Sequence, residues 1–333
     1  MKTTIATRNL VVIHAIAALL ACSSCVKHQV SFFSEAAEPF KEYTLQGAGK
    51  EKILMIPIKG TISDNNKDSS FSRKPSMVQT VVAQLRKAEK DKDIKAVILE
   101  IDSPGGSVTA SDMLYHEIAQ FRQRSGVKLA AVMMGVAASG GYYIALPADQ
   151  IWAHPTSITG SIGVIFLRPN VSGLMGKIGL DVEVDKSGKN KDMGSPFRKA
   201  TVEEQRIVQG LIDGLAERFL TLVASHRKLS DETRASISSA RIYAADDALR
   251  LGLVDQIGYL DETIKQTARM SGLPQNPKVV VYRRSEVADD NVYNTHSSRP
   301  SMPEINLVDL GLTESLPPLH SGFYYLWLPG QGE

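Results

Sequence analysis

Three short runs of almost uninterrupted apolar residues constrain the fold of this chain most strongly. They span 53–58, 96–101 and 129–134, and each is typical of a strand that is buried on both faces. Between them lie stretches with helical periodicity at 76–91 and 109–122. Because strands that alternate with helices favour a parallel sheet with crossover helices, the sequence predicts an α/β fold of this kind.

Further elements continue the alternation towards the C-terminus. A long helix is expected at 201–227, since Thr201 and Glu204 form a capping box at its start. Gly252 and Gly272 each follow the expected end of another helix. The remaining predicted elements are helices at 139–146, 244–251 and 261–271 and a last strand at 279–282.

Ser139 is the most informative single residue. It lies at a glycine-flanked junction between the apolar run at 129–134 and the helix expected at 139–146. A helix N-terminus has unpaired N–H groups that favour negative charge, so this position suits a nucleophile beside an oxyanion hole. Taken alone, the same small residues also fit a tightly packed helix start.

Four segments together carry a resemblance to a known family. A Pro-Gly-Gly turn follows the buried run at 96–101 and can bring bare backbone close to a ligand. The four segments are 102–107, 137–143, 156–163 and 186–198. In this order and spacing they resemble the signal peptide peptidase A (protease IV) family in its short bacterial form. The resemblance runs from about residue 53 to about residue 263.

The resemblance implies a role for each site residue. It places the nucleophile at Ser139, the general base at Lys191, and at Ser161 a hydroxyl that orients the lysine amine. It implies oxyanion-hole N–H groups from Gly106 and, beside the nucleophile, Gly140. It also implies the crotonase-like α/β superfold that is shared with the Clp peptidase, and a serine endopeptidase that acts through an acyl-enzyme.

The residues alone do not identify the general base. A serine nucleophile needs a base, and none of the seven histidines lies in a motif. A lysine can replace histidine only when neutral, which requires its pKa to fall about 2–3 units from about 10.4. Lys186 and Lys189 lie close to Lys191, and only the resemblance selects Lys191 among them. Asp192 is expected to be a local anchor or a solvated charge.

Composition excludes several other classes of protein. The net charge of +2 and the lack of a basic stripe with interleaved aromatic residues argue against a nucleic-acid partner. No Cys/His spacing suits a metal, and Gly105-Gly106 lacks the Lys-Ser/Thr of a phosphate loop. We therefore expect no metal and no cofactor.

The N-terminus has the pattern of an export leader. Lys2 and Arg8 precede an apolar run at 10–20, which is too short for a transmembrane helix of about 20 residues. The residues at 19–22 resemble a bacterial lipobox, which would make Cys22 the lipid-modified mature N-terminus. An ordinary cleaved leader and an uncleaved short anchor remain alternatives. A lipoprotein would place the enzyme at a membrane of the bacterial cell envelope, with its catalytic domain on the exported side.

The expected domains follow from these observations. They are a lipoprotein-type signal peptide at 1–21, a tether at 22–48, a Ser/Lys peptidase domain at 49–275 and a C-terminal arm at 276–333. The arm ends in an unusually apolar stretch at 323–328. This stretch is expected either to pack on its own body or a neighbouring chain, or to act as a ligand for the peptide groove.

The predicted function is a membrane-associated serine endopeptidase. Its substrates would be cleaved signal peptides and other apolar peptides. The family's long form combines two halves, so a single-half chain is expected to act as a homo-oligomer whose sites could cross chain boundaries. An acyl-CoA enzyme of the same superfold would not need Lys191 or a leader. A non-catalytic envelope scaffold would not need Ser139, Lys191 and Ser161 together.

Overall fold

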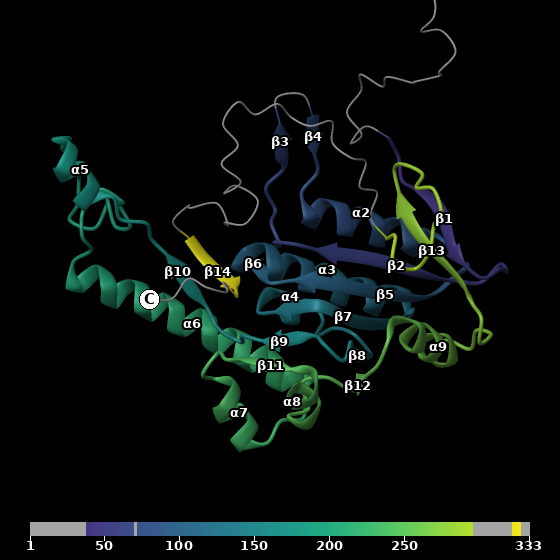
Figure 1. Cartoon of the computed structure of the whole chain (residues 1–333). Helices are drawn as coiled ribbons and strands as arrows, with labels where there is room; N and C mark the ends of the chain where they lie inside the picture. Colours follow the sequence, from purple (N-terminus) through teal and green to yellow (C-terminus); the bar gives the residue numbers. More distant parts are fainter. Residues whose placement is uncertain (1–37, 70–71, 296–321, 328–333) are drawn as a thin grey trace, which may run out of the picture.

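A nine-stranded sheet forms the centre of the molecule. The computed structural model describes residues 38–69, 72–295 and 322–327. The strands are β1 (Lys41–Gln46), β2 (Lys52–Lys59), β5 (Ile94–Ser103), β7 (Lys128–Ala138), β8 (Gln150–Ala153), β9 (Ile158–Gly160), β11 (Ile242–Ala244), β12 (Gln256–Ile257) and β13 (Lys278–Arg283). Their order is β1-β13-β2-β5-β7-β8-β12, with β9 pairing β7 and β11 pairing β9 (Figure 1). Only β1 and β11 run antiparallel to their neighbours, so the predicted parallel sheet is confirmed.

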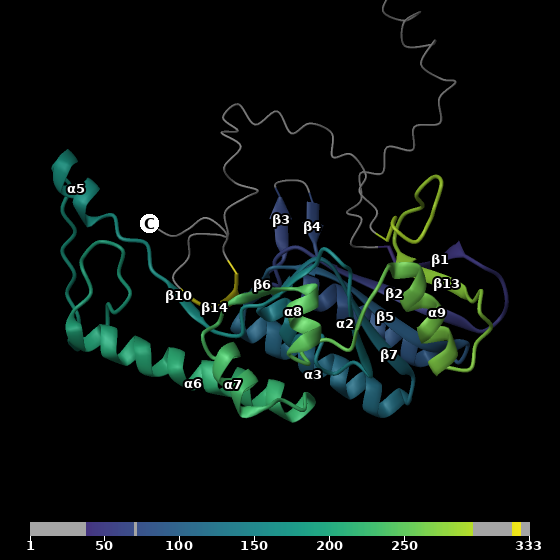
Figure 2. The same cartoon turned by 60° about the horizontal axis from the view of Figure 1, so that its bottom comes forward.

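Helices cover both faces of this sheet (Figures 1 and 2). They are α2 (Met77–Lys90), α3 (Val108–Ser125), α4 (Gly140–Tyr143), α5 (Ser172–Ile178), α6 (Val202–His226), α7 (Asp231–Ile237), α8 (Ala245–Arg250) and α9 (Leu260–Met270). Side chains of α2 and α3 pack in one apolar cluster and those of α9 in another. Among the described residues, no helix is long and apolar enough to cross a membrane.

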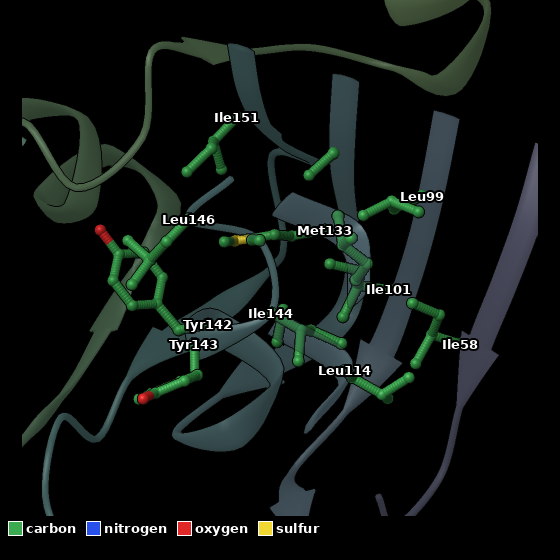
Figure 3. Close-up of a cluster of buried hydrophobic side chains, with 14 of the residues drawn as sticks. Ile58, Leu99, Ile101, Leu114, Met133, Tyr142, Tyr143, Ile144, Leu146 and Ile151 are labelled. Atoms are coloured by element: carbon green, nitrogen blue, oxygen red, sulfur yellow. The ribbon is translucent and has the colours of Figure 1, made fainter. Parts of the chain in front are cut away.

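The two clusters explain why the strands are apolar without interruption. Along β5, Val97 and Leu99 belong to the larger cluster, whereas Ala96 and Ile98 belong to the cluster under α9. Successive side chains of a strand point to opposite faces, and here both faces are covered. Figure 3 shows part of the larger cluster, where Ile101 and Met133 lie near Ile144, just beyond α4.

Two smaller sheets complete the described structure. A hairpin is formed by β3 (Lys67–Ser69) and β4 (Ser72–Lys74). A three-stranded sheet has the order β10-β14-β6, with β10 at Ile165–Leu167, β14 at Gly322–Leu326 and β6 at Gly105–Ser107. The strand β14 therefore places the C-terminal segment between β10 and β6.

The long helix is confirmed, but the helix after Ser139 is shorter than predicted. In α6, Thr201 caps the helix and Glu204 completes the predicted capping box. By contrast, α4 is a single turn, and the predicted helix at 139–146 is wrong beyond Tyr143. Pro147 follows this segment, and the residue before a proline disfavours the helical conformation.

Strands of the described structure lie within both of the outer ranges that the sequence analysis set apart from the peptidase domain. The range predicted as a tether, 22–48, contains β1, and the range predicted as an arm, 276–333, contains β13 and β14. The side chain of Glu42 in β1 accepts hydrogen bonds from Lys52 and Lys278, which are in β2 and β13. Because β1 buries only Leu45 fully, it has no apolar run that would mark it in the sequence. The predicted leader and Cys22 lie outside the described residues.

Candidate active site

Ser139 lies at the sharp turn between β7 and α4. Its backbone is at φ 53° and ψ −116°, an unfavourable conformation for a residue other than glycine, and strain of this kind costs on the order of 1–3 kcal/mol. The turn is held by a 2.8 Å hydrogen bond from the Ser139 N–H to the carbonyl oxygen of Gly160, at the end of β9. The Ser139 hydroxyl is buried and has no hydrogen-bond partner among the described residues.

Two glycine segments meet beside this serine. Gly105 has φ 101°, and a Cβ atom added to it would lie 2.7 Å from the backbone nitrogen of Gly140. A Cβ atom on Gly106 would overlap the carbonyl group of Ile62. A Cβ atom on Gly140 would lie 2.5 Å from the Ser111 hydroxyl oxygen. The strand β6 and the start of α4 can approach this closely only because these positions lack side chains.

A carbonyl oxygen already occupies the place where these segments meet. In the antiparallel pairing of β14 with β6, Tyr325 lies opposite Gly106. The Tyr325 carbonyl oxygen would be 3.0 Å from a Cβ atom on Gly140, and it would overlap one on Gly105. The structure therefore brings Gly105 and Gly140 to this oxygen atom, while Gly106, like Gly140 predicted as an oxyanion-hole donor, is the ladder partner of the same tyrosine.

The C-terminal strand enters this site as an extended peptide. It pairs with β6 on one side and with β10 on the other, both antiparallel. Past β14, the Trp327 N–H donates to the carbonyl oxygen of Pro104 over 2.9 Å. The apolar tail thus packs on its own chain, as one of the two predictions for it stated, and it does so in the groove beside Ser139.

Ser161 borders the same region from the other side. It also has a positive φ, 51°, and its N–H donates to the carbonyl oxygen of Arg241 over 2.8 Å. Together with Leu326 and Trp327 it lines a cavity of about 470 Å³. Because Ser161 directly follows Gly160, whose carbonyl holds the Ser139 turn, the two predicted serines are close in the fold.

Lys191 is not joined to Ser139 within this chain. It lies in the exposed loop between α5 and α6 and makes no side-chain hydrogen bond or ion pair with any described residue. The Ser139 hydroxyl likewise has no partner there. Figure 1 shows α5 and this loop well away from α4.

The loop nevertheless distinguishes the three lysines that the residues alone left equivalent. Lys186 donates to Asp192 over 2.7 Å, and Lys189 donates to Glu203 over 2.7 Å. Both amines are therefore engaged as cations in ion pairs. Of the three, only Lys191 is left available for a partner outside the described structure.

A charged network anchors the loop to α6. Arg198 donates to Asp192 through Nε and Nη2, each over 2.8 Å, and to Glu204 through Nη1 over 3.0 Å. These bonds hold the pKa of Asp192 well below its usual range, with Lys186 adding to the effect. The Arg198 bond and the Thr201 N–H also lower the pKa of Glu204, to about 2. Of the two alternatives for Asp192, a local anchor or a solvated charge, these bonds show the anchor.

Sequence reasoning missed the pocket that receives the Tyr325 side chain. Its ring stacks on Tyr143 with centroids 5.0 Å apart and contacts Phe219 at 4.8 Å. Its hydroxyl donates to the carbonyl oxygen of Leu215 over 3.0 Å. Tyr143 stands in the motif segment, but nothing in the sequence connects that segment to α6.

No group of three or more acidic, His or Cys side chains in the described part of the chain could hold a metal ion.

Comparisons with known proteins point to a family of peptidases. The family model of Peptidase family S49 matches residues 121–273, and that of Clp protease matches 71–157. A protein named "Putative signal peptide peptidase SppA" from Enterococcus faecium is 36% identical over 70% of this chain and 67% of its own length. A "Putative protease MJ0651" from Methanocaldococcus jannaschii is 35% identical over 72% and 76%. "Serine protease SPPA, chloroplastic" from Arabidopsis thaliana is 31% identical over 74% of this chain but only 36% of its own length.

Proposed function

This chain belongs to peptidase family S49 and is a serine-type peptidase, and on that basis we propose that it cleaves apolar peptides through a Ser139/Lys191 dyad. Ser139 attacks the peptide carbonyl and Lys191, as the neutral amine, accepts its proton. The developing oxyanion accepts hydrogen bonds from the N–H groups of Gly106 and Gly140. Ser161 orients the lysine amine.

One observation carries this proposal. A buried serine hydroxyl with no partner in the described part of the chain stands in a strained turn, directly before the glycine whose backbone lies against the Tyr325 carbonyl oxygen. A peptide carbonyl is thus held beside a nucleophile, between two backbone segments that can donate to it. In many acyl-transfer enzymes, such preorganised donors make the largest single contribution to stabilising the transition state.

We propose that each site is completed by a neighbouring copy of the chain. Ser139 has no base beside it within the described chain, and the loop with Lys191 is exposed and anchored through Arg198 rather than folded back. The surface near this loop carries exposed apolar side chains, among them Leu174, Ile178 and Leu211. A head-to-tail assembly would cover them and bring each lysine to the next serine.

A mixing experiment tests both the dyad and the assembly. Ser139→Ala and Lys191→Ala proteins are each expected to be inactive, and they are mixed under conditions that exchange subunits. If nucleophile and base come from different chains, random exchange in equal amounts restores about one quarter of the sites. Native mass spectrometry confirms that mixed oligomers have formed. Absence of activity in proven mixed oligomers would place both residues of each site in one chain.

We propose further that the enzyme acts on signal peptides at a bacterial membrane, held there by lipid on Cys22. A relative bears the name of a signal peptide peptidase, and the 19–22 segment resembles a lipobox. Stable attachment takes more than one acyl chain, which lipoprotein processing would supply. Mass spectrometry of the mature N-terminus tests this: a diacylated Cys22 is expected, and an unmodified N-terminus downstream of Cys25 would contradict it.

Labelling with a fluorophosphonate separates the peptidase from the two alternative classes. An acyl-CoA enzyme of the same superfold or a non-catalytic scaffold should not be tagged. The peptidase should be tagged at Ser139, as mapped by peptide mass spectrometry. Because Lys191 activates the serine in the proposed mechanism, Lys191→Ala should reduce the rate of labelling, whereas Lys189→Ala should not.

A further inference from the structure

We propose that Asp102 is a positioning residue for the nucleophile, because its carboxylate fixes a bulge in β7 that sets where Ser139 stands. This inference rests on the proposed function, in which Ser139 attacks the peptide carbonyl. Asp102 acts on the serine through the backbone of β7 and takes no part in the chemical step itself.

The pairing of β5 with β7 contains a bulge shortly before the nucleophile turn. Pairing runs in step up to Met133 on β7 and resumes at Ala137. On β5 the same interval holds only Asp102, so one residue of β5 faces residues 134–136 of β7. Bulges bend a strand and re-aim its side chains, and they are frequent next to active sites.

The bulge is also the place where β7 changes its neighbour. Before it, residues 130–133 pair with β8, and after it, residues 136–138 pair with β9. The ladder with β9 ends at Gly160, whose carbonyl oxygen accepts the Ser139 N–H over 2.8 Å. The shape of the bulge therefore sets where along β9 the turn at Ser139 falls.

The Asp102 side chain packs on the backbone of this bulge. Its Oδ1 accepts a hydrogen bond from the Val136 N–H over 2.9 Å. A Cβ atom added to Gly135 would lie 2.9 Å from the same oxygen, so only a glycine leaves room for the carboxylate there. Ser157, directly before β9, donates from its hydroxyl to the carbonyl oxygen of Met133 over 2.8 Å. The bulge is thus held from the strands on both sides of β7.

Asp102 also connects the nucleophile turn to the glycine segment beside it. Its backbone continues through Ser103 into β6, which contains Gly106. A Cβ atom added to Gly141 would lie 2.5 Å from the Ser103 carbonyl oxygen, so this backbone also touches α4. One residue therefore fixes the serine relative to its proposed oxyanion donors. A displacement of about 1 Å at such a site can cost about 100-fold in rate.

Two substitutions at Asp102 test whether the hydrogen-bond acceptor is what matters. Asp102→Asn keeps an acceptor oxygen and should retain kcat within about threefold of the parent, since a neutral acceptor is weaker than a charged one. Asp102→Ala removes the acceptor and should lower kcat about 100-fold, while KM changes less than about threefold. Peptide hydrolysis by the full-length protein over a range of substrate concentrations measures both constants. Equal losses in the two variants would contradict the inference.

Asp149 provides a matched control on the same strand. Its Oδ2 accepts from the Leu129 N–H over 2.9 Å, near the opposite end of β7, and its carboxylate also pairs with Arg122. Asp149→Ala should therefore lower the melting temperature at least as much as Asp102→Ala, yet leave kcat unchanged. A fall in kcat that follows the melting temperature in both variants would show that general weakening of β7, and not positioning, explains the loss.

Gly135→Ala disturbs the same contact from the other side. The three atoms nearest to the added methyl group all belong to the Asp102 side chain, so the carboxylate should be pushed away from Val136. We expect kcat to fall by about 10- to 100-fold. In the Asp102→Ala protein there is no carboxylate to displace, and adding Gly135→Ala should change kcat less than about twofold. Losses that multiply in the double variant would contradict the shared contact.

Fluorophosphonate labelling separates failure of this inference from failure of the proposed function. Circular dichroism first shows that each variant is folded at the assay temperature. Labelling of the parent at Ser139, together with parental kcat in Asp102→Ala, would overturn this inference alone. A parent protein that is not labelled at Ser139 would overturn the proposed function, and this inference with it.

Discussion

Tyr325 lies opposite Gly106 in the ladder between β14 and β6, with its carbonyl oxygen against the backbone at Gly140. Residues more than 200 positions apart in the sequence thus form one site. The tail can reach this place because β6 leaves one edge free for pairing and both glycines leave space above it. This single relationship links the turn at Ser139, the glycine backbone beside it and the pocket that holds the Tyr325 side chain.

Loss of either dyad residue should remove nearly all turnover. Because nucleophile and base act as a unit, Ser139→Ala and Lys191→Ala should each lower kcat roughly 10⁴-fold or more. Lys189→Ala is the matched control in the same loop, since that amine is paired with Glu203. Peptide hydrolysis at saturating substrate measures all three. Wild-type turnover by Lys191→Ala would show that another group is the base.

Gly106→Ala should cost folding stability rather than turnover alone. The added methyl group would overlap the carbonyl group of Ile62, which is backbone and cannot rotate away. Overpacking of this kind costs about 1–3 kcal/mol or more. Gly188→Ala is the control, because nothing lies within 4 Å of a Cβ atom there. Thermal unfolding compares the two, and equal melting temperatures would contradict the close approach of β6 to Ile62.

The anchor beneath Lys191 should make stability depend on pH in the acidic range. The Arg198 guanidinium lowers the pKa of Glu204 to about 2 in the folded state, from about 4.5 in an unfolded chain. A carboxyl group whose pKa is lowered in the folded state stabilises the fold at pH values above its pKa in the unfolded chain. This stabilisation is lost as the pH falls towards 2.

Glu204→Gln is the variant that tests this dependence. It keeps the shape of the cap but removes the charge, so its melting temperature should fall less steeply between pH 4.5 and 2 than that of the parent. Glu183→Gln, at an exposed position in the loop between α5 and α6, is the control. If the melting temperature of Glu204→Gln fell as steeply with pH as that of the parent, the Arg198 network would contribute nothing to the pH dependence of stability.

Tyr325→Ala should open the groove to added peptide. The tail of the same chain occupies the site, so its release should raise kcat/KM for short peptides severalfold while kcat at saturation changes little. The melting temperature should fall, since about 3 kcal/mol of buried aromatic packing is lost. Tyr259→Ala, at an exposed position, should change neither quantity. A lower melting temperature with unchanged kcat/KM would mean that β14 lies outside the path of the substrate.

The sequence by itself determined the layered parallel sheet. The runs at 53–58 and 96–101 each contain one exception to an otherwise apolar sequence. A strand needs apolar residues at successive positions only when both of its faces are covered. Local chemistry was equally sufficient for α6, because Thr201 and Glu204 cap it through contacts three residues apart. The motif around Ser139 likewise marked the position of the strained turn, since that turn depends on its own small neighbours.

Only the tertiary structure decided what surrounds that serine. Strand β1 pairs with β13, more than 230 residues away, and so was not visible as a local pattern. The pocket for Tyr325 joins Tyr143 to α6 and the C-terminal segment, which is long-range packing that no local spacing encodes. The ion pairs of Lys186 and Lys189 likewise became visible only in the fold, because charge pairing depends on position in space.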